Sequence, residues 1–186
     1  MARYVSLTAL LCIMLMAAVT FIGPNKARAA SGAEIDRNVD AALKTLFAKS
    51  ASAKALAEKA QGILVFPGIV KAGFVVGGQY GEGALRKDGK TVGYYNSVAA
   101  SYGWQAGIQK FGYALFFMSD SAMKYLDKSN GWELGTGPSI VVVDVGAARS
   151  LSTTTAKSDI YAFFFSQKGL MAGIGLQGTK ITRLNK

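Results

Sequence analysis

Apolar positions near the start of the chain recur at helical spacing. Within residues 34–49 a single stripe is formed by Ile35, Val39, Ala42, Leu43 and Leu46, at the three- and four-residue spacing of an amphipathic helix. Serine caps and glycine stops predict two shorter helices, over residues 52–61 and 122–128. The commoner role of such a stripe is to pack on a sheet, and the alternative is a basic amphipathic element on a membrane surface.

Most of the remaining chain has the pattern of strands joined by short turns. Residues 63–66 form an apolar run rich in β-branched and aromatic side chains, and Pro67-Gly68 is expected to end it as a turn. Asp88-Gly89, within the polar segment 86–90, predicts a hairpin. Further strands are predicted over residues 69–76, 91–108, 111–118, 132–137, 139–145, 152–155 (strand or loop) and 160–165. Residues 140–143 would be buried on both faces if that strand is central.

Glycines are dense between Ala60 and Leu85, at positions 77, 78, 81 and 83. Within strands, such glycines bend the backbone or allow two backbones to approach closely, so the sheet is expected to curl. A phosphate-cradling loop is the alternative, but the segment lacks the Gly-Lys-Ser/Thr ending and the helix-opening GxGxxG pattern. The predicted fold class is α+β: a curved antiparallel sheet or partial barrel, with N-terminal amphipathic helices and one short internal helix.

The first 29 residues have the layout of a secretory signal peptide. Arg3 precedes an apolar run over residues 5–22, and Ala27-Arg28-Ala29 is a small-x-small cleavage site. Cleavage after Ala29 would leave residues 30–186 as a single domain in the periplasm; an uncleaved anchor is the alternative, because the run is long enough to span a bilayer. Lipidation at Cys12 is not expected, since Leu11 stands where a small residue is required.

Charge and composition narrow the possible chemistry. Without residues 1–29 the chain keeps 18 basic residues against 11 acidic ones, a net charge of about +7, which favours anionic partners. Lipid is preferred to nucleic acid, because the chain is expected to be exported and has no basic runs interleaved with aromatics. No histidine occurs, and no cysteine follows Cys12. Thiol and imidazole catalysis and the usual zinc sites are therefore excluded, and no cofactor is expected.

Several separated motifs resemble the SYLF lipid-binding domain family. The first is the run from Ala60 to Pro67, followed by Lys71-Ala72-Gly73-Phe74, Gly77-Gly78 and Gly81-Glu82-Gly83. Downstream motifs are Ser101-Tyr102-Gly103-Trp104-Gln105-Ala106-Gly107, Gly137-Pro138, Lys168-Gly169-Leu170, Ala172-Gly173 and Leu176-Gln177-Gly178. The resemblance covers about Ile35 to Ile181. The chain differs from many eukaryotic members at Tyr94-Tyr95-Asn96, where those members carry a Trp-Ser-x-Pro run.

The resemblance implies a lipid-binding domain. In eukaryotic members it implies phosphoinositide binding through a basic amphipathic helix and, in some, association with actin; bacterial members are exported and membrane-associated. We therefore expect a non-catalytic protein, peripheral to a membrane, that binds anionic phospholipid through basic residues and an apolar groove between helix and sheet. The candidate lipid-binding residues are Arg37, Lys44, Lys54, Lys59, Lys71, Arg86, Lys87 and Lys90. The alternatives are a small outer-membrane β-barrel or structural envelope protein, and a hydrolase using carboxylates or Lys and Tyr.

Overall fold

The computed structural model describes residues 30–128, 132–134, 136–143, 158–168 and 178–186, without the side chains of residues 74–76, 101–107 and 167–168. In this part of the chain the helices are α2 (Gly32–Lys49), α3 (Ala51–Ala57) and α4 (Asp120–Lys128). The strands are β1 (Gly62–Lys87), β2 (Lys90–Phe117), β3 (Trp132–Glu133), β4 (Ile140–Val143), β5 (Ile160–Lys168) and β6 (Lys180–Leu184). The predicted signal peptide, the segment 152–155 and the motif Lys168-Gly169-Leu170 lie wholly or partly outside the described residues.

The three predicted helices are confirmed, each with slightly different ends. Ser31 caps α2, because its side-chain oxygen accepts a hydrogen bond from the backbone N–H of Glu34, and Ser50 caps α3 in the same way. The stripe predicted for α2 is also confirmed: Ile35, Val39, Ala42 and Leu46 are buried. No helix among the described residues has the length and apolar character needed to cross a bilayer.

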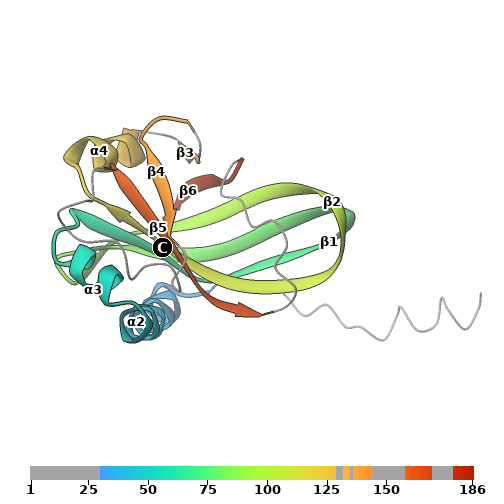
Figure 1. Ribbon diagram of the computed structural model, residues 1–186, viewed down its shortest axis with the longest axis horizontal. Helices are drawn as coiled ribbons and strands as arrows, with labels where there is room; N and C mark the ends of the chain where they lie inside the picture. Colours follow the sequence, from blue (N-terminus) through green and yellow to red (C-terminus); the bar gives the residue numbers. More distant parts are fainter. Residues whose placement is uncertain (1–29, 129–131, 135, 144–157, 169–177) are drawn as a thin grey trace, which may run out of the picture.

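β1 and β2 form one long antiparallel hairpin, paired from Gly62 with Phe117 to Lys87 with Lys90 (Figure 1). The predicted Asp88-Gly89 turn closes it, and both residues have positive φ (50° and 74°), as a tight hairpin turn requires. The turn predicted at Pro67-Gly68 is wrong. β1 runs on through these residues with a register shift between Phe66 and Ile69, and a strand accommodates a proline at such a bulge.

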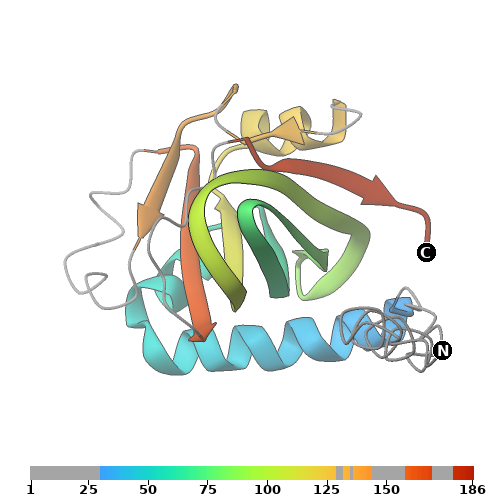
Figure 2. The ribbon, with the colours of Figure 1, turned by 90° about the vertical axis from the view of Figure 1, so that its right-hand side faces the viewer.

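The hairpin curls so strongly that the two halves of β1 meet. Figure 2 shows β1 and β2 as nested arches above α2. At Gly83 a Cβ atom would lie 2.1 Å from the carbonyl oxygen of Val65, and at Gly81 it would lie 2.6 Å from that of Gly68. Only glycine permits these approaches, so the expectation that glycines bend and close the sheet is confirmed.

The rest of the sheet is built on the other edge of β2. β6 pairs with β2 over Tyr94–Val98 and β5 pairs with it over Lys110–Phe117, while β3 extends from β6. β4 lies parallel to β5, so the sheet is mixed rather than purely antiparallel. β4 is also not central: it ends the strand path, and Val141 and Val142 are 38% and 56% exposed. A run of four apolar residues therefore marks an edge strand here, in which only Val143 is buried.

Two hydrophobic cores lie on opposite faces of the curled sheet, because successive strand residues point in opposite directions. The core inside the curl includes Phe66, Tyr113 and Leu115 and is capped by Leu126 of α4. The core outside it lies under α2 and α3 and includes Val65, Ala114, Phe116, Phe163 and Phe165. The predicted α+β fold with a curved sheet is thus confirmed, and α2 covers the outer face where the two halves of β1 meet.

Candidate functional site

A groove of about 740 Å³ runs between α2 and the curled strand β1; we call it the α2–β1 groove. It follows the line along which the two halves of β1 approach each other. Its lining is contributed by α2 (Ile35, Asn38, Ala41, Ala42 and Thr45), by β1 (Pro67, Gly68, Val70, Tyr80, Gly81 and Glu82), and by Ala30 and Ser166. The structure thus contains a groove between helix and sheet, as the sequence predicted.

Short side chains keep this groove open. Asn38, Ala41 and Thr45 follow one another at three- and four-residue spacing, so they lie along one flank of α2. No charged residue of α2 lines the groove. Gly68 and Gly81 add no side chain from the strand. The same glycines that let β1 close therefore also leave room beneath the helix.

A polar cluster, the Glu82 cluster, lies at one part of the groove wall and consists of Tyr80, Glu82 and Lys186. The hydroxyl of Tyr80 donates to Glu82 Oε1 at 2.8 Å, and Lys186 Nζ donates to Glu82 Oε2 at 2.7 Å and to the carbonyl of Ala30. The side chains of Glu82 and Lys186 are only 11% and 12% exposed. This ion pair neutralises the single acidic side chain among the groove-lining residues.

The same contacts shift two pKa values. Burial alone would raise the pKa of Glu82, but the hydrogen bonds from Lys186 and Tyr80 and the charge of Lys186 lower it overall. Burial and the neighbouring carboxylate raise the pKa of Tyr80 to about 12. Glu82 is therefore ionised and Tyr80 neutral at physiological pH. The wall of the groove thus contains one polar cluster whose side chains are held in place by hydrogen bonds to Glu82.

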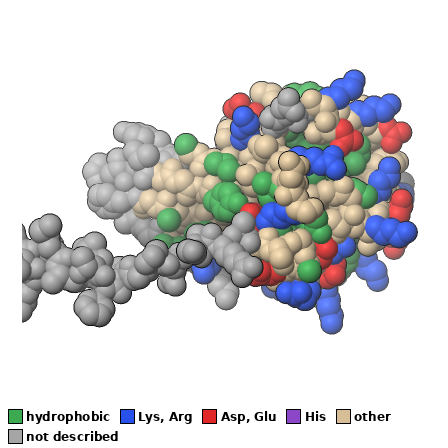
Figure 3. Space-filling view, turned by 180° about the vertical axis from the view of Figure 1, so that it is seen from behind, with side chains coloured by type: hydrophobic (Ala, Val, Ile, Leu, Met, Phe, Trp, Pro, Cys, Tyr) green, Lys and Arg blue, Asp and Glu red, His purple; other side chains and the backbone are tan. Residues whose placement is uncertain are grey.

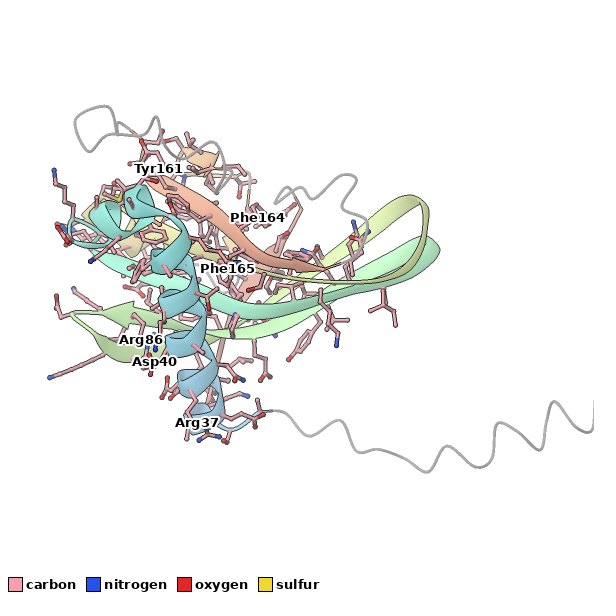
Figure 4. All side chains as sticks on the ribbon, turned by 60° about the horizontal axis from the view of Figure 1, so that its bottom comes forward. Arg37, Asp40, Arg86, Tyr161, Phe164 and Phe165 are labelled. Carbon is pink, nitrogen blue, oxygen red and sulfur yellow. The ribbon has the colours of Figure 1, made fainter. Side chains whose placement is uncertain are left out.

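On the other flank of α2, a second cluster fixes the helix to the hairpin. Arg86 lies 2.5 Å from Asp40 Oδ1 and donates to the backbone carbonyl of Asp36 at 3.2 Å. Thr91 and Tyr94 donate to the two carboxylate oxygens of Asp36, at 2.6 and 3.0 Å. Figure 4 shows Arg86 beside Asp40, with Arg37 farther along the helix. We call these five residues, Asp36, Asp40, Arg86, Thr91 and Tyr94, the Asp36 cluster.

The structure separates the eight candidate lipid-binding residues. Arg37, Lys44, Lys54 and Lys59 are exposed on or beside α2 and α3, and Lys87 and Lys90 are exposed beside the hairpin turn. Lys71 stands apart, half-buried in β1. Arg86 differs from all of these, since its side chain is 13% exposed and ion-paired within the Asp36 cluster. The ion pairs found in the described part of the chain involve none of the other seven.

Sequence reasoning missed three features of the site. The flank of small residues on α2 was visible in the spacing of Asn38, Ala41 and Thr45 but was not used. The pair formed by Glu82 and Lys186 joins residues 104 positions apart, and no local pattern signals it. Ser166, which lines the groove, has a φ of 54°; it lies in the bulge where β5 passes Gly112.

Comparison with known families adds an independent observation. Residues 98–186 match the model of a family described as "Ysc84: Las17-binding protein actin regulator". This segment is similar to the Ysc84 (SYLF) domain family. The resemblance noted in the sequence motifs is confirmed. No curated protein matches the chain.

The SYLF match begins inside β2 and takes in α4 and the strands β3 to β6. Its principal partner in the sheet lies upstream, because β1 pairs along the whole of β2. The α2–β1 groove lies largely upstream too: of the lining residues that the structure describes, only Ser166 falls within the matched SYLF segment. Among the described residues, no group of three or more Asp, Glu, Cys or His side chains is placed to hold a metal ion.

Proposed function

We propose that this SYLF protein binds membrane lipid without catalysing a reaction, and that the α2–β1 groove receives an apolar part of the lipid. The groove is the observation that carries the proposal. Its lining is mostly aliphatic or small, its acidic residue is neutralised by Lys186, and its volume of about 740 Å³ lies in the range of small-molecule sites. The lipid-binding role implied by the SYLF resemblance supports the same conclusion.

We further propose that basic residues near the groove attract anionic headgroups. Arg37 and Lys44 lie seven residues apart on the solvent side of α2, and Lys54 and Lys59 continue the positive charge along α3 and the turn after it. Each cation near an anionic membrane contributes about 1 kcal/mol of binding, within a screening distance of about 10 Å. Four acting together are sufficient to hold the protein at such a surface.

Reversing these charges is expected to abolish binding to anionic vesicles. The first variant replaces Arg37, Lys44, Lys54 and Lys59 with Glu. A second variant replaces Lys87 and Lys90 with Glu and leaves Arg86 in its ion pair. Flotation with vesicles of phosphatidylcholine and phosphatidylglycerol measures the loss, which should be several kcal/mol for the first variant. Vesicles of phosphatidylcholine alone should bind weakly, and salt should weaken the anionic contact.

A matched control is available on α4. Lys124 and Lys128 are exposed, and α4 packs with the core inside the curl, on the opposite face from α2. Replacing both with Glu should leave flotation nearly unchanged. If neither reversed set weakens binding while groove substitutions do, the electrostatic part of the proposal is wrong and the protein holds lipid through its acyl chain alone.

Export is part of the proposal. Arg3, the apolar run and the Ala27-Arg28-Ala29 site predict a mature protein that begins at Ala30 and lies in the periplasm, peripheral to a membrane. Residues 30–186 would then form one domain, which agrees with the pairing of β1 along all of β2. Mass spectrometry of the purified protein should find the N-terminus at Ala30. Full-length protein recovered from the cytoplasm would contradict this.

A further inference from the structure

α2 covers the outer face of the hairpin where the two ends of β1 come together. It does not cover the middle of the strands β1 and β2. Beyond the groove, cross-strand pairs place Val70 with Lys110, Ala72 with Ile108, Gly78 with Ala100 and Tyr80 with Val98. Four of these side chains are large, apolar and exposed: Val70 43%, Tyr80 49%, Val98 43% and Ile108 68%. We call Val70, Ala72, Gly78, Tyr80, Val98, Ala100 and Ile108 the distal face.

The alternation along β1 assigns these residues to one side. Gln79, between Gly78 and Tyr80, is buried and donates to the hydroxyl of Thr179 at 3.2 Å. Gly78 and Tyr80 therefore point to the opposite side of the strand, toward solvent. A contiguous exposed apolar face of this kind is typical of a surface with a binding partner.

The distribution of charge indicates which partner. Residues 72–81 and 91–109 contain no Asp, Glu, Lys or Arg. Charge returns where this stretch ends, at Lys71 and the exposed Lys110, and the nearest acidic residue along β1, Glu82, is paired with Lys186. Of the two cations, Lys110 lies on the distal face as the partner of Val70, whereas Lys71 alternates to the other side of β1. Figure 3 shows hydrophobic side chains toward the distal part of the hairpin, and charged side chains of both signs around the body. An apolar face with an exposed cation at its border complements an anionic bilayer, with an apolar interior beneath its headgroups.

The distal face is also continuous with the α2–β1 groove, because Val70 and Tyr80 belong to both. Tyrosine is enriched at membrane interfaces, where its ring and hydroxyl suit the change from apolar to polar surroundings. A lipid chain leaving the bilayer at this face would therefore meet the groove without crossing water. If a second copy of the chain covered this face instead, the groove would have no adjoining source of lipid.

We propose that the distal face is the part of the protein that enters the interfacial layer of an anionic bilayer, with Lys110, the cross-strand partner of Val70, at headgroup depth. This inference rests on the proposed lipid-binding function and adds the surface that makes the contact. It differs from the role of the cations on α2, which act from outside the apolar layer.

Site-specific fluorescence tests which surface inserts. An environment-sensitive fluorophore is attached to Ile108→Cys or Val98→Cys in a Cys12→Ser background, because Cys12 is the only cysteine in the chain. Val142→Cys provides the matched control, since Val142 is an exposed apolar residue on β4. With phosphatidylcholine–phosphatidylglycerol vesicles, the labels at 108 and 98 should shift to shorter wavelength and be quenched by spin-labelled lipid. The label at 142 should not respond.

The other outcomes separate this inference from the function on which it rests. If vesicles bind but only a label at Lys44→Cys responds, α2 makes the contact and the inference is wrong, while lipid binding stands. If no vesicle binds the unlabelled protein, both fail. If the label at 108 responds to protein concentration without vesicles, the face joins two copies of the chain, which also overturns the inference.

A charge placed on the distal face supplies a second measurement. Ile108→Glu should weaken partitioning into the anionic vesicles by at least about tenfold, because an exposed apolar contact is replaced by a group that resists the apolar layer. Val142→Glu should change partitioning little. Circular dichroism establishes that both variants remain folded, and equal partitioning of the two would refute the inference.

Discussion

Replacing Gly83 with alanine is expected to destabilise the fold by about 3 kcal/mol, near the upper end for an overpacked site. The new Cβ would lie 2.1 Å from the carbonyl oxygen of Val65 and 2.8 Å from the ring of Phe66. A flexible side chain could move aside, but a strand backbone cannot do so without separating the two halves of β1. The urea midpoint of unfolding, with its slope unchanged, measures the loss.

The control for this substitution lies in the same strand. At Gly78 a Cβ atom would find its nearest neighbour, the carbonyl oxygen of Ala99, at 3.8 Å, which is ordinary contact. Gly78→Ala should therefore change stability by less than about 1 kcal/mol. If both variants unfold at the same urea concentration, closure of β1 on itself does not depend on glycine at position 83.

These two glycines show how far a local pattern predicts a fold. The density of glycine between residues 60 and 85 correctly predicted a curling sheet, because glycine permits bends and close approach wherever it occurs. It did not distinguish Gly83, which touches Val65, from Gly78, which touches little. That distinction depends on which segments meet after folding, and the residues that meet are far apart in the sequence.

The errors in the predicted elements have the same origin. Pro67-Gly68 was read as a turn because both residues favour turns, yet the pairing with β2 continues past them and absorbs them as a bulge. The apolar run of β4 was compatible with a central strand. In the described sheet, however, β4 has a neighbouring strand, β5, on one side only. In both cases tertiary pairing overrode a local preference.

The presence of a groove could be predicted from the sequence, but the surroundings of each basic residue could not. A groove between helix and sheet follows from an amphipathic helix on a curled sheet. The solvated positions of Lys44 and Lys54 follow from the helical period. The burial of Arg86 does not, because its place in a polar hairpin segment indicated a solvated cation. Only the fold places the hairpin against Asp36 and Asp40 of α2, where Arg86 stabilises the scaffold.

One residue that lines the α2–β1 groove can be changed without disturbing the core beneath α2. Ala41 lines it, yet its side chain is exposed and lies outside the buried stripe of α2. Ala48, seven residues farther along, has the same direction on the helix and is not among the lining residues. A large side chain at either position should leave the core packing intact, and only the first should occupy the groove.

Ala41→Trp is accordingly expected to reduce binding of a fluorescent fatty acid by at least about tenfold, because the indole fills space that the acyl chain requires. Ala48→Trp should bind as the unaltered protein does. Titration of each protein with the fatty acid measures the effect, and urea unfolding establishes that both variants keep nearly the original stability. Undiminished binding by a folded Ala41→Trp variant would show that the acyl chain does not enter the groove. In that case lipid would be held at the membrane surface alone, and the cations and the distal face would account for all of the affinity.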